Sequence, residues 1–296
     1  MMRFDREQLE TLAAVVAAGT FDAAAERLSV TPSAVSQRIK ALEQRLGRLV
    51  VVRSKPIRAT DAGTALLRLV QQLAALELEA GSELGIAESA APVSIPLAVN
   101  ADSMATWLLP ALAEVARAHP LVFELHRDDQ EYTAGLLAAG TVMAAVTSDS
   151  RPVSGCSVTP LGRMLYHPVA APAFAERWLP DGPTAAALAD APVVVFDRKD
   201  ELQSRYLRTV TRTPLTPPQH FVPASADFAV AIELGLGWGM LPAAQFEPGR
   251  RSGALVVLDE ARPVAVPLHW QQWNLRSTAL EVVAAAIVSH ARAALV

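Results

Sequence analysis

The sequence predicts an α/β protein whose N-terminal head is rich in helices: a winged helix-turn-helix, a linker helix and a two-lobed α/β domain. Three observations predict this fold. Three short helix patterns, each preceded by a capping residue, fill the first 47 residues. A long amphipathic stretch follows from Asp61, and strand and helix patterns then alternate twice after Val93. We place the domain boundaries at 1–60, 61–88 and 89–296.

Composition narrows the class of protein. The chain has 296 residues and a net charge of −4, but residues 1–60 hold ten Lys and Arg against six Asp and Glu. A basic module on an acidic body suggests that only the module contacts a polyanion. The N-terminus has no apolar stretch, no run reaches the ~18 apolar residues of a membrane span, and Cys156 is the single cysteine. We therefore expect a cytoplasmic protein without membrane contact.

Capping residues define the predicted helices of the head. Asp5 and Thr20 each precede a helical pattern, and their side chains can accept a hydrogen bond from a free N–H of the first turn. Thr31 precedes the third pattern, with Pro32 at its first position, where a missing N–H costs nothing. Gly47 ends that helix. Two short helices, a tight turn and a third helix form a helix-turn-helix.

The third helix and the segment after it carry the predicted DNA contacts. Hydroxyl and amide side chains can read base edges, whereas Arg and Lys bind phosphate or guanine. Residues 49–60 are expected to form a two-stranded wing whose cations face the DNA backbone. The alternative is an ordinary helical hairpin with a polar face. The predicted DNA-binding residues are Thr31, Ser33, Ser36, Gln37, Arg38, Lys40, Arg53 and Arg58.

The head resembles that of LysR-type transcriptional regulators. The segment FDAAAERLSVTPSAVSQRIKALEQRLGRLVVVR, followed by ATDAG, carries this resemblance, which covers roughly residues 5–65. It implies a double-stranded DNA operator as partner. It also implies that Ser33, Ser36, Gln37 and Arg38 lie in the major groove, with Arg53 on the wing.

The stretch from Asp61 to about Ile86 is predicted to be one helix, with Thr60 as its cap. Its apolar residues recur at spacings of three and four, as in a helix-pairing seam. We expect it to pair with the same helix of a second subunit; the alternative is packing on its own C-terminal domain. The family resemblance implies a homodimer through this helix, a homotetramer and a partly palindromic operator.

The C-terminal part is predicted to form two α/β lobes with parallel strands. We expect lobe I at about 93–166 and 268–296, and lobe II at about 167–267. The chain would cross between the lobes near 161–166 and 267–270. This arrangement resembles the periplasmic-binding-protein-like effector domain of the LysR family.

Ligands in such sheets bind beyond the carboxyl ends of the strands. Asn100, Asp102 and Ser103 follow the first strand and open a helix, whose free N–H groups suit a carboxylate. Asp128 and Asp129 follow the next strand and suit a cation. The alternative is that Asp102 caps its helix and that the aspartate pair belongs to a solvated turn.

A narrower resemblance concerns the whole chain. The segments LAVNADSMATWLLPAL, AAVT, APVVVFD and GLGWGMLP are similar to the ArgP/LysG branch of the LysR family, which comprises lysine- and arginine-responsive regulators of basic amino-acid exporter genes. The resemblance implies lysine or arginine as effector and Asp129 as the first partner of its cationic side chain. With the residues placed by the strand ends, the predicted effector site comprises Asn100, Asp102, Ser103, Thr106, Trp107, Asp129, Thr147, Phe196 and Asp227.

The sequence thus predicts an effector-responsive transcriptional regulator that controls a transporter, exporter or amino-acid metabolism gene, with RNA polymerase as a further candidate partner. One alternative is a ligand-independent architectural or replication-control DNA-binding protein, and another is an enzyme or solute-binding protein with an accessory head. No catalytic constellation and no metal-ligand spacing is evident, so we expect no enzyme activity, no metal and no cofactor. The operator, the regulated gene, activation or repression, the choice between lysine and arginine, and dimer or tetramer stay open.

Overall fold

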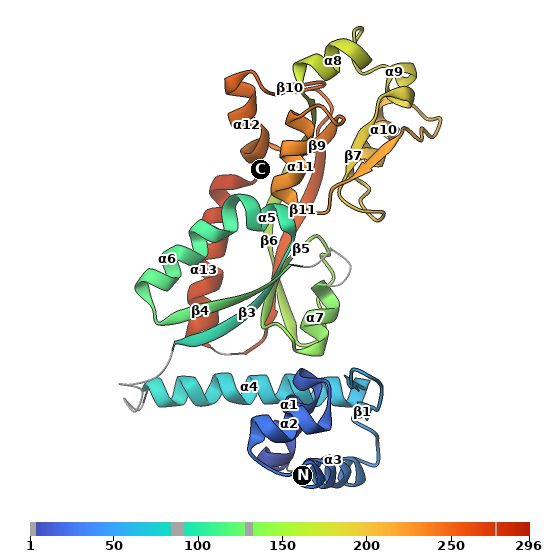
Figure 1. The fold of residues 1–296 in the computed structure, drawn as a ribbon. Coiled ribbons are helices and arrows are strands. Elements are labelled where there is room, and N and C mark those ends of the chain that lie inside the picture. The colour runs from blue at the N-terminus through green and yellow to red at the C-terminus, as the bar shows by residue number, and fades with distance from the viewer. Residues whose placement is uncertain (1–3, 84–91, 128–132, 276) are drawn as a thin grey trace.

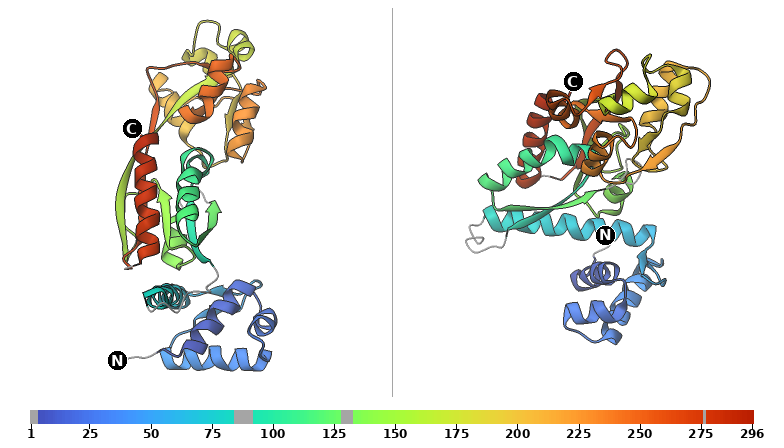
Figure 2. Two further views of the ribbon diagram at one scale, coloured as in Figure 1. Left: turned by 90° about the vertical axis from the view of Figure 1, so that its left-hand side faces the viewer. Right: turned by 45° about the horizontal axis from the view of Figure 1, so that its top comes forward.

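The computed structural model describes residues 4–83, 92–127, 133–275 and 277–296. It consists of a small helical head, a long helix and an elongated α/β body of two lobes (Figure 1). The long helix lies between the head and lobe I in each view (Figures 1 and 2). Among the described residues, no helix is both long and apolar enough to cross a membrane.

The head has the predicted winged helix-turn-helix architecture. Its helices and strands are α1 (Arg6–Ala18), α2 (Phe21–Leu28), α3 (Pro32–Leu46), β1 (Val51–Val52) and β2 (Arg58–Ala59). The two strands pair antiparallel and form the wing. Apolar side chains from α1 and α3 make the centre of the head, where Leu12, Val35, Ile39 and Leu42 are fully buried.

The predicted caps are confirmed at all three helices. The side chains of Asp5, Thr20 and Thr31 each accept a hydrogen bond of 3.2 Å from the backbone N–H three residues later. Gly19 and Gly47 end α1 and α3 with positive φ angles of 71° and 65°, a conformation that glycine adopts without steric cost. Local capping therefore accounts for where the head's helices begin and end.

The linker helix is α4 (Asp61–Glu83), and its predicted end near Ile86 lies outside the described residues. Thr60 caps it by accepting from the N–H of Gly63 at 3.1 Å. The helix packs on the head through buried Leu66 and contacts lobe I through Arg68. In this single chain, Leu73 and Leu76 of the predicted pairing seam are 40% and 43% exposed. The contact with its own C-terminal domain therefore leaves the seam available to a partner.

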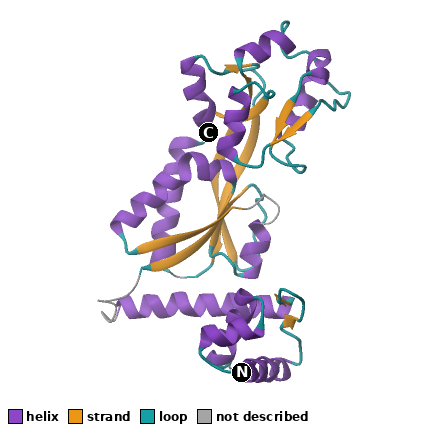
Figure 3. Cartoon of the chain, in the orientation of Figure 1, coloured by secondary structure: helices purple, strands orange, loops and turns teal. Residues whose placement is uncertain are grey.

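One seven-stranded sheet runs through both lobes, in the order β10-β6-β11-β5-β3-β4, with β9 paired to β6. In lobe I, β3 (Val93–Val99) is parallel to both β4 (Leu121–Arg127) and β5 (Ala144–Thr147). The long strands β6 (Cys156–Ala170) and β11 (Val264–Trp273) are antiparallel to each other and connect the lobes (Figure 3). The expectation of parallel pairing is therefore correct for β3, β4 and β5, and also for β7 (Val193–Val195) and β8 (Gln219–Phe221), which form a separate two-stranded sheet. It fails for β6 and β11 because the chain leaves lobe I on one and returns on the other.

The first helix of lobe I begins at the end of β3. It consists of α5 (Ala101–Ser103), a π-helical turn (Met104–Leu108) and α6 (Leu109–Ala118). Such π turns within α-helices often accompany functional sites. The other helices of this lobe are α7 (Thr133–Ala139) and the closing α13 (Thr278–Ala294).

Lobe II is built from short strands and helices. Its strands are β7 (Val193–Val195), β8 (Gln219–Phe221), β9 (Gly239–Pro242) and β10 (Val256–Val257). Its helices are α8 (Pro172–Trp178), α9 (Ala185–Asp190), α10 (Leu202–Val210), α11 (Ser225–Glu233) and α12 (Ala243–Ser252).

Candidate functional site

One polar face of α3 is exposed. Ser33, Ser36, Gln37 and Lys40 are all exposed and recur at spacings of three and four, so they share one side of the helix. Thr31 is exposed at the helix start, but its hydroxyl is engaged as the cap. These side chains present hydroxyl, amide and ammonium groups on one surface, which is the chemistry that base edges and phosphates require.

The wing carries two of the cations that the sequence predicts to bind DNA. Arg53 and Arg58 are both exposed. The Arg53 guanidinium lies 5.7 Å from the centre of the Phe21 ring on α2, a cation–π contact that ties the wing to the helices. The two arginines can therefore reach a phosphate backbone from a supported position.

Arg38 is placed differently from the other predicted reading residues. It forms an ion pair of 2.8 Å with Glu7 of α1, and its side chain is 30% exposed. An α-helix turns about 100° per residue, so Arg38 projects roughly 140° away from Ser33 around the axis. Arg38 therefore lies on a flank of α3 that faces α1, and its contact with DNA stays a prediction.

A cavity of about 350 Å³ lies between the two lobes. It borders the start of the first lobe I helix, the segment after β7, the start of α11 and both connecting strands. Its lining residues are Asn100, Ala101, Asp102, Tyr166, Phe196, Asp197, Lys199, Asp200, Glu201, Leu202, Arg205, Ser225, Phe228, Met240, Leu241 and Val266.

Asp102 joins the lobes at this cavity. Its Oδ2 accepts a hydrogen bond of 2.7 Å from the Tyr166 hydroxyl, and its Oδ1 accepts one of 2.7 Å from the Ser225 hydroxyl of lobe II. Gln245 in turn donates to the Ser225 oxygen at 2.6 Å. Burial, together with the nearby Asp102 charge, raises the pKa of Tyr166 well above its usual value, so this phenol stays a donor. The alternative in which Asp102 caps its own helix is not what the structure shows, because both oxygens accept from other elements.

Two polar atoms next to Asp102 are buried and unused. Among the described residues, neither the Asn100 side-chain oxygen nor the Ser103 hydroxyl has a hydrogen-bond partner. Ser103 is fully buried and Asn100 lines the cavity. Unpaired buried polar groups destabilise a protein, so Asn100 is a candidate for contact with a polar ligand.

The lobe II wall of the cavity is acidic. Asp197, Asp200 and Glu201 follow β7 directly and line the cavity opposite Asp102. Asp200 accepts hydrogen bonds from the N–H groups of Phe196 and Leu202, at 3.1 and 3.0 Å.

Asp200 is a carboxylate whose charged form a bound cation would stabilise. Its pKa is raised, mainly because burial penalises the charged form and also because Asp102 is near. Of the two cations in the lining, Arg205 donates to the Ala265 carbonyl at 2.8 Å. Four carboxylates against two cations therefore leave a site that favours a positively charged group.

The predicted effector residues divide into two sets. Asn100, Asp102 and Phe196 line the cavity. The other described residues of the predicted site do not line it. In lobe I, Ser103 and Trp107 are buried, Thr106 donates to the Asp102 carbonyl at 2.6 Å, and the Thr147 hydroxyl accepts from the Asp149 N–H. In lobe II, Asp227 is exposed on α11. Asp128 and Asp129 lie outside the described residues.

Sequence reasoning missed the acidic segment after β7. The rule that ligands bind beyond the carboxyl ends of strands selects this segment, and it identified Phe196 but not Asp197, Asp200 or Glu201. The charged run from Asp197 to Glu201, directly after three buried valines, is the signal that could have found them. In the part of the chain that the structure describes, no group of three or more His, Cys, Asp or Glu is arranged to hold a metal ion.

Two family models match the chain. Residues 6–64 match the model described as "Bacterial regulatory helix-turn-helix protein, lysR family", and residues 94–292 match the "LysR substrate binding domain". Together these models cover the head and both lobes.

Similar proteins span nearly the full chain. The HTH-type transcriptional regulator LysG of Mycobacterium tuberculosis is 48% identical over 275 residues, covering 93% of this chain and 89% of the relative. The crystal structure of ArgP from the same organism superposes with a TM-score of 0.91 at 45% identity, covering 99% of both chains. Full-length LysG from Corynebacterium glutamicum with bound effector Arg superposes with a TM-score of 0.81 at 36% identity, again over 99% of both chains.

Proposed function

The chain belongs to the LysR family of bacterial DNA-binding transcriptional regulators, and on that premise we propose that its two-lobed domain senses a basic amino acid, lysine or arginine. The observation that carries this proposal is the acidic cavity between the lobes, with Asp102, Asp197, Asp200 and Glu201 in its wall. At about 350 Å³ it falls within the range of small-molecule sites.

Each end of such a ligand finds matching chemistry. A guanidinium or ammonium side chain gains most from Asp200, whose charged form is destabilised by burial. The polar backbone end of the ligand can use the unpaired Asn100 oxygen and the lining cations. The C. glutamicum relative whose structure holds Arg supports this assignment.

The response follows from a population shift. A ligand that contacts both walls favours one spacing of the lobes over others by the difference in its affinity for them. Lobe I contacts α4, and α4 packs on the head. A movement of lobe I can therefore move the head through α4. Two chains paired through Leu73 and Leu76 would hold two heads at a fixed separation on a partly palindromic operator.

We further propose that the regulated gene encodes a transporter, exporter or amino-acid metabolism protein, that dimers assemble into tetramers, that RNA polymerase is a further partner and that the protein acts in the cytoplasm. The names of the relatives support the class of gene: LysG of C. glutamicum is named a lysine export transcriptional regulatory protein.

A thermal-shift screen against the twenty amino acids tests the effector assignment. A ligand that binds only the folded protein raises Tm by mass action, so arginine or lysine should raise it while the acidic amino acids should not. Asp200→Asn should lose this shift, and Asp181→Asn, which changes an exposed aspartate of lobe II, should keep it. No shift with any amino acid, together with tight DNA binding, would favour the ligand-independent alternative.

A further inference from the structure

Arg68 of the linker helix is held by two backbone carbonyls of lobe I. Its Nη2 donates to the carbonyl of Ala138, and its Nη1 donates to the carbonyl of Ser154 at 3.0 Å. Ala138 lies in the last turn of α7, where carbonyls lack intrahelical partners and the helix dipole favours a cation. Arg68 therefore donates hydrogen bonds to a free carbonyl at the end of α7 and to the carbonyl of a second lobe I segment at the same time.

Gly140 brings the two backbones into direct contact at the same place. Its φ angle is +74°, and a Cβ added to it would lie 2.6 Å from the Cα of Arg68. No larger residue fits without separating α4 from lobe I. The close approach and the two hydrogen bonds are independent observations that locate one docking point.

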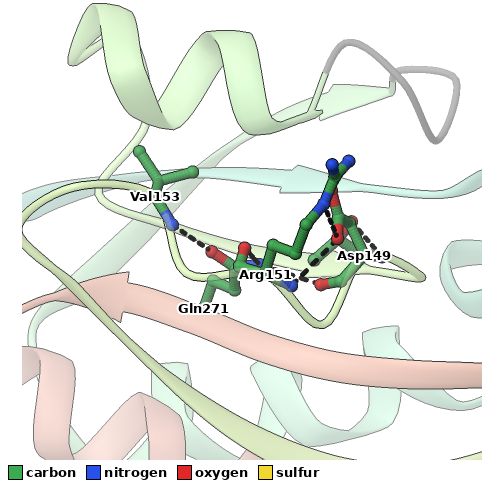
Figure 4. A network of polar contacts seen from close by, with 5 residues as sticks. Asp149, Arg151, Val153 and Gln271 are labelled. Atoms are coloured by element: carbon green, nitrogen blue, oxygen red, sulfur yellow. Dashed lines mark hydrogen bonds and ion pairs between the residues drawn. The ribbon is translucent and has the colours of Figure 1, made fainter.

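Ser154 connects this point to the strands that link the lobes. Gln271 of β11 is buried, and its amide donates to the carbonyls of Asp149 and Arg151 at 2.9 and 3.0 Å. The oxygen of the same amide accepts from the Val153 N–H at 3.2 Å (Figure 4). The segment from 149 to 153, which directly precedes Ser154, is thereby fastened to a strand that extends into lobe II.

The docking point does not compete with the other contacts of α4. Leu66 faces the head, while Leu73 and Leu76 are exposed for pairing. With about 100° per residue, Arg68 projects on a separate side of the helix from Leu66. One helix can therefore contact the head, its own lobe I and a second subunit together.

We propose that Arg68 is the positioning residue that makes the linker helix follow the arrangement of the two lobes. Because it bonds to α7 and to the segment fastened by Gln271, a shift of β11 relative to α7 changes both of its contacts. The inference rests on the proposed function only in naming the amino acid as the natural cause of such a shift. The docking itself can be tested without ligand or DNA.

The ligand-free test uses hydrogen exchange of the full chain. Ser225→Ala removes a hydrogen bond between the lobes and so perturbs their arrangement. In the wild-type background, this change should alter amide exchange in residues 61–83. In Arg68→Ala and in Gly140→Ala, exchange there should already be faster, and adding Ser225→Ala should have no further effect. Arg292→Ala, at an exposed arginine of α13, is the matched control and should behave as wild type.

A second arm uses L-arginine as the probe. The wild type should show protection at residues 196–205 and altered exchange in α4, whereas Arg68→Ala should show only the protection at 196–205. If α4 of Arg68→Ala responds to Ser225→Ala as the wild type does, the proposal is overturned. Absence of protection at 196–205 in the wild type would instead count against the proposed effector, and the ligand-free arm would still decide the role of Arg68.

Discussion

Ser225 donates a hydrogen bond of 2.7 Å to Asp102, and this contact joins lobe II to lobe I beside the cavity. The two residues are 123 positions apart in the chain. Since Tyr166 occupies the other carboxylate oxygen, both oxygens of Asp102 accept from neutral hydroxyls. Asp102 thus joins the two lobes in the wall of the cavity.

Removing this contact should weaken the effector domain. Ser225→Ala deletes a buried hydroxyl that bonds to a charged group, and we expect the free energy of unfolding to fall by about 1–2 kcal/mol. Urea unfolding measures the loss. Ser204→Ala, at an exposed serine of α10, is the control and should change stability little. Equal stability of the two variants would mean that the contact between the lobes contributes nothing.

Arginine binding should depend on pH through Asp200. Its raised pKa means that it takes up a proton at a higher pH than an ordinary aspartate, and a protonated carboxyl no longer attracts a guanidinium. Affinity should therefore be fully present at neutral pH and fall as pH is lowered through the raised pKa. Isothermal titration calorimetry between pH 7.5 and pH 5 would follow the change. An Asp200→Asn variant that binds as tightly and with the same pH profile would exclude this carboxylate.

Substitutions on α3 should distinguish residues that bind phosphate from residues that read bases. Lys40→Ala should weaken binding to all sequences and lower the salt slope by about 1, because one phosphate contact is lost. Gln37→Ala should instead reduce discrimination at one base pair, by about 1–3 kcal/mol, with little change in the slope. Fluorescence anisotropy at several salt concentrations, with DNA selected from a random pool, distinguishes them. Identical effects of both changes would contradict the assignment of these side chains.

The exposed seam of α4 should control assembly. A charge at an apolar pairing position is costly to bury, so Leu73→Glu combined with Leu76→Glu should shift the protein toward monomers. Light scattering after size-exclusion chromatography reports the mass. Ser289→Glu introduces a charge at an exposed site of α13 and should leave the mass unchanged. A doubly substituted protein that stays dimeric would place the interface elsewhere.

The head shows how far sequence patterns reach. Its caps at Asp5, Thr20 and Thr31 act within three residues, and its buried positions follow the period of the helix. Both are local properties, so they could be predicted without knowing how the chain folds back on itself. Arg38 is the exception, because its ion pair with Glu7 depends on how α1 packs against α3.

The effector site was predicted only in part for a related reason. The strand-end rule identified Asn100, Asp102 and Phe196, all of which line the cavity. It could not show that the first of these segments faces Asp200, because β3 and β7 belong to different lobes whose relative position depends on β6 and β11. A fifteen-residue strand that serves both lobes has no distinctive local pattern.

The sequence by itself determined the order of the parts, the caps and periods of the helices, the family and the exposed polar face of α3, since each depends on residues close together along the chain. Only the tertiary structure decided which carboxylates share a cavity, that Asp102 bonds to Ser225, and that Arg68 docks on Ala138 and Ser154. The physical reason is that these contacts join segments about 70 to 120 residues apart, whose approach depends on the packing of the whole core.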